Sequence, residues 1–204
     1  MSNSRRIVVA LVVALAVVGL SACAKAPQEA IDQVQAAIAA AEQAEAPTYA
    51  PEAWEAAQQE LNQAMAEIEA QNAKFALTRS YKQASELLAT AQQSAAAAQD
   101  EALANKEQMR LEVEGAIASI EESLAAADGL LESLATCRRR PKGFASDLEM
   151  MRGNVDGLRT QLADVQAKAA EESFAEAKSM ADGLLEGLNA AVSDMENVKA
   201  KIGC

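Results

Sequence analysis

The sequence predicts an all-α protein, built as an elongated antiparallel helical bundle or coiled coil. Nearly half of its hydrophobic residues are alanine, the strongest helix former. Its four prolines, Pro27, Pro47, Pro51 and Pro141, all lie outside the segments with a repeating apolar pattern. Within those segments apolar residues recur every three or four positions, and no segment shows the alternation that a strand requires.

The first two helices are expected on either side of Pro47. The segment from about 28 to 45 carries apolar residues on one face, among them Ile31. Proline is well suited to a first helical turn, so we expect the second helix to begin at Pro51. Its apolar seam fades at Gln71-Asn72.

A long third helix follows. Its apolar repeat begins at Leu77 and alternates by steps of four and three, which is heptad spacing. One extra residue after Val113 is a stutter, which unwinds a supercoil locally without ending it. If unbroken from about 77 to 136, this helix would be roughly 90 Å long. Asn105 and Gly115 are where we expect any break.

Two further helices, Phe144 to Ala169 and Phe174 to Ile202, carry bulkier seams than the Ala-rich segments before them. Ser80 to Ala84 aligns with Ser173 to Ala177, which suggests an internal duplication. The chain then reads as two spectrin-like three-helix units sharing the long central helix. The units are an Ala-rich one at 28–110 and one at 111–204, and the alternative is one folded-back bundle of four or five helices.

Residues 1–22 have the composition of a secretion signal. Arg5 and Arg6 precede an apolar run that ends at Leu20. A helix of that run would be roughly 21 Å long, against a hydrocarbon core of roughly 30 Å, so a permanent signal anchor is the weaker alternative. The arginine pair also loosely resembles a twin-arginine signal, although the apolar run suits the general secretory route better.

The segment Leu20-Ser21-Ala22-Cys23 resembles the lipobox of bacterial lipoproteins. The resemblance implies a diacylglyceryl group on the Cys23 thiol, cleavage before Cys23, and a lipidated tether at 23–27. It also implies attachment to a bacterial cell envelope on the periplasmic side. Ala24 is not the aspartate that favours inner-membrane retention in enteric bacteria, so the outer membrane is the favoured site.

The body of the chain resembles Ala-rich helical domains of unknown function in Gram-negative envelope lipoproteins. The resemblance is carried by Tyr49-Ala50-Pro51-Glu52-Ala53-Trp54 and by the later Ser80-Tyr81-x-x-Ala84. It implies a location in the envelope and no particular activity.

The two remaining cysteines, Cys137 and Cys204, are expected to pair, because disulfides persist outside the cytoplasm. An antiparallel hairpin folded near Ala170-Glu171 places them at almost equal height at its open end. In the chain-entropy model, a bridge that closes a loop of this length stabilises the folded state by on the order of 4 kcal/mol. The alternative is two unpaired structural cysteines.

Arg138, Arg139, Arg140 and Lys142 form the only concentrated positive charge in the sequence. They could contact phosphate or carboxylate groups of lipid headgroups, cell-wall polymers or an acidic partner. The alternative is that cations near a helix C-terminus offset its dipole and solubilise the turn.

The composition disfavours several functions. The chain has no histidine, which is the commonest general base and metal ligand, and its formal charge of -12 opposes nucleic-acid binding. We therefore expect no enzyme, and no catalytic, cofactor-binding or metal-binding residues. The expected role is a structural, spacer or adaptor component whose partners are the membrane, through its lipid, and an envelope protein or cell-wall polymer. The alternative is a binding or chaperone-like module that accepts an apolar or helical ligand.

Overall fold

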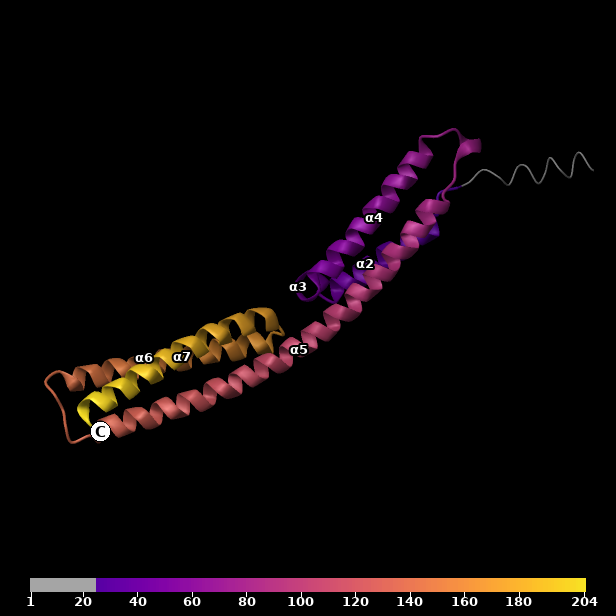
Figure 1. The fold of residues 1–204 in the computed structure, drawn as a ribbon. Helices are drawn as coiled ribbons and strands as arrows, with labels where there is room; N and C mark the ends of the chain where they lie inside the picture. The colour runs from indigo at the N-terminus through magenta and orange to yellow at the C-terminus, as the bar shows by residue number, and fades with distance from the viewer. Residues whose placement is uncertain (1–24) are drawn as a thin grey trace, which may run out of the picture. The chain divides into compact units, whose positions relative to one another are not determined.

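The computed structural model describes residues 25–204, and all regular structure in that range is helical (Figure 1). The prediction of an all-α helical bundle is confirmed. The elements in chain order are α2 (Gln28–Gln43), α3 (Ala46–Tyr49), α4 (Pro51–Asn72), the 3-10 turn η1 (Ala76–Thr78), α5 (Lys82–Ala135), α6 (Phe144–Ala170) and α7 (Phe174–Ile202). The expected signal segment and Cys23 lie outside the described residues. Of the helices in 25–204, none combines the length and the apolar character needed to cross a bilayer.

The chain divides into two compact units that meet between Leu103 and Ala104, within α5. Unit 1 contains α2, α3, α4 and the first part of α5, and unit 2 contains the rest of α5 with α6 and α7. Each unit therefore combines three long helical segments, and the sequence division at 110/111 falls on the same shared helix. The origin of this layout in a duplication stays a prediction.

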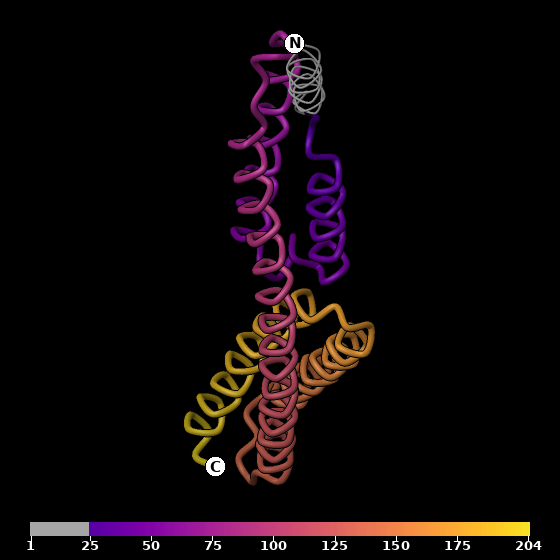
Figure 2. The backbone as a smooth tube through the Cα atoms, turned by 90° about the vertical axis from the view of Figure 1, so that its right-hand side faces the viewer, coloured from indigo at the N-terminus to yellow at the C-terminus, as the bar shows by residue number. Residues whose placement is uncertain are grey.

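Most of the buried hydrophobic positions of unit 1 in the described chain are alanines, so its core is thin. Figure 2 shows α2 and α4 alongside the first part of α5, and one buried cluster joins the three helices. Its members are Ile31, Val34, Ala64, Ile68, Tyr81, Ala84, Leu88 and Ala91. Alanine contributes little apolar area, so each buried position stabilises this unit less than a leucine would.

Helix α5 has 54 residues and continues without interruption through Asn105 and Gly115, so neither position breaks it. A glycine inside a helix costs roughly 0.5–1 kcal/mol relative to alanine. The fully buried side chains of Val113 and Ile120 on either side of Gly115 offset that cost by packing. Tertiary packing therefore outweighs the local preference.

The start of α5 differs from the sequence expectation, because Leu77 lies outside it. Leu77 belongs to η1 and is 73% exposed, whereas Tyr81, immediately before α5, is 7% exposed. The physical reason is the set of hydrogen bonds in the α4–α5 connection. Arg79 donates to the carbonyl oxygens of Asn72 and Lys74 at 2.8 and 2.9 Å, which holds the chain in a turn where the apolar repeat predicted a helix.

Unit 2 has a bulkier core. Its main cluster is formed by large side chains of α5, α6 and α7, which include Ile120, Leu124, Leu134, Phe144, Leu148, Val155, Leu162, Leu184, Leu188 and Met195. A smaller cluster of Val113, Phe174 and Ala177 closes the end near the α6–α7 turn. Lys106 also contacts Glu172 of that turn at 3.3 Å.

Candidate functional site

The candidate site lies at the end of unit 2 where α5 ends and α7 ends. Here Cys137 and Cys204 form a disulfide, with Cα atoms 5.9 Å apart and a sequence separation of 67. The two helices α6 and α7 fold back on each other at 171–173, which returns the chain to the end of α5. The pairing predicted from the hairpin geometry is thus present in the structure.

Arg140 is turned toward the last turn of α5. Its guanidinium donates to the carbonyl oxygen of Cys137 at 3.2 Å and to that of Ala135. Ala135 is the last residue of α5, so its carbonyl lies at the negative end of the helix dipole and lacks a partner within the helix, whereas Cys137 lies two residues beyond the helix end. Arg140 therefore acts as a C-terminal cap of α5. This matches the alternative given for the basic run, in which cations near a helix C-terminus offset its dipole.

The other three cations of the run behave differently. Arg138, Arg139 and Lys142 are exposed, and none has a hydrogen-bond or ion-pair partner within residues 25–204. Arg138 and Arg139 line a shallow hollow of about 590 Å³ beside the disulfide, whereas Lys142 does not. The remaining lining is formed by Ser133, Thr136, Cys137, Gly203 and Cys204.

The chemistry of this hollow suits an anion. Two guanidinium groups without partners can bind one phosphate or carboxylate through charge-assisted hydrogen bonds. The disulfide ties Cys137, which directly precedes the two arginines, to Cys204. The tight run predicted from the sequence therefore separates into a cap, Arg140, and a basic hollow lined by Arg138 and Arg139.

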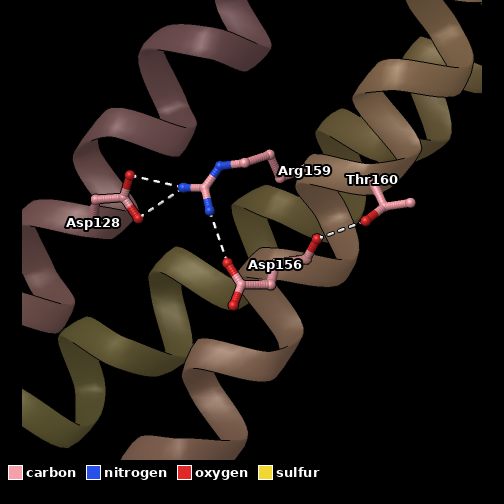
Figure 3. A network of polar contacts seen from close by, with 4 residues as sticks. All are labelled: Asp128, Asp156, Arg159 and Thr160. Carbon is pink, nitrogen blue, oxygen red and sulfur yellow. Dashed lines mark hydrogen bonds and ion pairs between the residues drawn. The ribbon is translucent and has the colours of Figure 1, made fainter.

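A polar network between α5 and α6 was missed by sequence reasoning. Figure 3 shows Arg159 between two carboxylates: it donates to both Asp128 oxygens at 2.9 and 3.0 Å and to Asp156 at 2.7 Å. Thr160 donates to the Asp156 carbonyl at 3.1 Å. The ion pairs are about half exposed, so their stabilisation is at most modest. The network connects α5 with α6 through the Arg159–Asp128 ion pair.

A second depression lies between α6 and α7 and was also missed. Its volume is about 330 Å³, and Met150, Met151 and Met195 give it an apolar floor. Asp147 and Asp194 also line it. Met150 is 60% exposed, which leaves a flexible, polarizable side chain open to solvent. The neighbouring Met150-Met151 pair was the signal available in the sequence.

No group of three or more Cys, Asp or Glu side chains in the described part of the chain is arranged to hold a metal ion. Comparison of the sequence and structure with protein-family models, curated proteins and solved structures finds no match.

Proposed function

We propose that this protein is a lipid-anchored, non-enzymatic component of a bacterial cell envelope, held on the periplasmic side of the outer membrane as a structural, spacer or adaptor element. The observation that carries the proposal is α5, one uninterrupted helix that belongs to both units. A helix of 54 residues has a contour of about 80 Å. The same helix supplies one long helical segment to each unit.

The anchor argument rests on how soon the fold begins after Cys23. Ala26 and Ala30 already pack against the buried cluster of unit 1. The three peptide steps from Cys23 to Ala26 reach about 10 Å at most. A lipid on Cys23 would therefore hold unit 1 close to the membrane surface, and any reach would come from the helices.

The adaptor argument rests on the basic hollow of Arg138 and Arg139. The chain carries 30 acidic and 18 basic residues, so an exposed pair of unpartnered arginines is a local exception. Anionic groups of a cell-wall polymer or an acidic envelope protein match this chemistry. Nucleic acid is a poor candidate for the same hollow, since the surrounding acidic surface repels a polyanion.

Mass spectrometry of the protein extracted from membranes tests the anchor directly. The expected result is an N-terminal peptide that begins at Cys23 and carries acyl chains. The Cys23→Ala variant should lose both processing and lipid. If the Cys23→Ala variant is cleaved and bound to membranes as fully as the native chain, the lipoprotein assignment is wrong.

Crosslinking in intact cells tests the adaptor role. Arg139→Gln removes one cation that lines the hollow, and Lys142→Gln is the matched control, because Lys142 is exposed and unpartnered within 25–204 but does not line it. We expect Arg139→Gln to lower the yield of the native crosslinks and Lys142→Gln to leave it unchanged. Equal crosslink yields for both variants and the native chain would contradict the role of the hollow.

The methionine-floored depression favours a second candidate, a binding module for an apolar ligand. Its volume lies at the small end of the range for ligand pockets. A ligand that occupies it should raise the thermal midpoint of unfolding, and Met150→Glu should abolish that rise. Concentration-dependent assembly without any ligand-dependent shift would favour the structural role instead.

A further inference from the structure

The connection between α4 and α5, residues 73–81, is called the unit 1 tip. It carries Phe75, which is 72% exposed, and Leu77, which is 73% exposed. Within residues 25–204 these are the two most exposed large hydrophobic side chains. Large apolar side chains are mostly buried in a core, so two exposed ones at a single turn mark a candidate interaction surface.

Hydrogen bonds hold the unit 1 tip in this open form. Besides the two bonds that Arg79 donates across the turn, the Thr78 hydroxyl donates to the Phe75 carbonyl at 2.8 Å. The backbone N–H of Ser80 donates to the Gln71 side chain at 3.1 Å, and the Tyr81 hydroxyl donates to Asn72. The exposure of the apolar pair is therefore part of an ordered turn.

The charge around the unit 1 tip is the reverse of the charge of the whole protein. From 70 to 85 the sequence contains Lys74, Arg79 and Lys82 and no acidic residue, although acidic residues outnumber basic ones in the chain. Lys82 is highly exposed, and its only close carboxylate in the described structure, Glu86, is 3.9 Å away. Exposed apolar side chains flanked by lysines match the interface of an anionic bilayer.

The tip lies at the end of unit 1 where the described chain begins. Ala26 packs against the buried cluster that contains Ile68 of α4 and Tyr81, the last residue of the tip. Figures 1 and 2 show the α4–α5 connection and the start of α2 at the same end of unit 1. Lys25, the first described residue, adds a further cation at this end.

We propose that the unit 1 tip is a second membrane contact, in which Phe75 and Leu77 insert into the interfacial region of a phospholipid bilayer and Lys74 and Lys82 contact anionic headgroups. The choice of a bilayer over a protein partner rests on the proposed lipid anchor, since Cys23 is separated from Lys25 by one residue. One anchored point leaves a protein free to tilt, whereas a second contact at the same end sets the orientation of unit 1 on the membrane.

Tryptophan fluorescence tests this proposal, because the chain has a single tryptophan, Trp54. Trp54 lies in the first turn of α4, about 27 Å along the helix from Asn72 and the tip. The full chain, extracted from membranes, is reconstituted with vesicles of phosphatidylethanolamine and phosphatidylglycerol that carry bromine on their acyl chains. The variants are Trp54→Phe with Phe75→Trp, and Phe75→Trp alone, with the native chain as the matched control.

The expected result is a blue shift and strong quenching of the emission from position 75 by the brominated lipids, with little quenching of Trp54 in the native chain. Adding Leu77→Asp should abolish most of the quenching. Lys74→Glu should reduce it at low salt and matter less at high salt, because salt screens the headgroup contact. Circular dichroism of each variant verifies the helical fold, and exposed positions such as 75 and 77 tolerate exchange.

The proposal is wrong if brominated lipid quenches the tryptophan at position 75 no more than it quenches Trp54. It is also wrong if Leu77→Asp leaves the quenching at position 75 unchanged. Failure of the lipid anchor has a different signature. Mass spectrometry then shows an unmodified Cys23, while the quenching still reports on the tip. An acylated Cys23 with an unquenched position 75 leaves the proposed function standing and removes only the second contact.

Discussion

Removal of the Cys137–Cys204 disulfide is expected to destabilise unit 2 far more than unit 1. The bridge connects residues 67 positions apart, and the closed loop contains all of α6 and α7. Reduction, or a Cys137→Ser and Cys204→Ser double variant, frees this loop in the unfolded state. The folded helices keep the packing of the unit 2 core, which does not depend on either sulfur atom.

The magnitude follows from the entropy of closing a loop of this size. For a sequence separation of 67, the chain-entropy relation gives about 4.4 kcal/mol at about 25 °C. Each 1.4 kcal/mol is about a factor of ten in an equilibrium constant, so the open form of unit 2 becomes roughly a thousandfold more populated. With an m-value of roughly 2 kcal/mol/M in urea, the unfolding midpoint of unit 2 falls by about 2 M.

Hydrogen exchange separates the two units. Amides of α7 should exchange roughly a thousandfold faster after reduction, provided they exchange through global opening of unit 2. Trp54 lies in unit 1, so its fluorescence supplies the internal control. Loss of the disulfide should shift the urea midpoint followed by Trp54 fluorescence less than the midpoint followed by the helical signal at far-ultraviolet wavelengths. Peptide mapping that finds no linked Cys137 and Cys204 peptides, or equal α7 exchange with and without reductant, would refute the reasoning.

Three further predictions concern packing, backbone and charge. Leu188 is fully buried, so Leu188→Ala should cost about 2–5 kcal/mol by urea unfolding, whereas Leu103→Ala, at a 52% exposed position, should stay within about 0.5 kcal/mol. Gly153→Ala should raise stability by about 0.5–1 kcal/mol, because a Cβ at this position meets no atom within 4 Å. A loss of stability would contradict this and would mean that the added methyl group clashes with a neighbouring side chain. The hydrogen bond from Arg110 holds the pKa of Glu107 below its ordinary 4.5. That stabilisation is complete above the ordinary pKa and is lost as the pH falls through the lowered one, so Glu107→Gln should flatten the acid side of the stability profile; an unchanged profile would contradict the pairing.

Much of the helix layout was predictable from local chemistry. Pro51 marks the first residue of α4, because proline fits a first turn, and the seam of that helix fades at Asn72, where it ends. The disulfide was predictable because the hairpin lengths on both sides of 171–173 are nearly equal. Each of these features depends on spacing along one helix or one hairpin.

The candidate site was only partly predictable. The sequence located the basic run, but it could not tell that Arg140 turns back to the end of α5 while Arg138 and Arg139 line the hollow. Leu77 shows the converse problem. It continues the apolar repeat of α5, yet hydrogen bonds from Arg79 keep it in a turn and expose it.

The sequence by itself determined the all-α class, the ends of most helices and the pairing of Cys137 with Cys204, because periodicity, proline placement and chain length act locally. Only the tertiary structure decided that α5 runs through Gly115, that Arg159 reaches Asp128 on another helix, and which cations lack a partner within 25–204. These features depend on which side chains meet across helices, and packing between distant segments outweighs the weak local preferences of single residues.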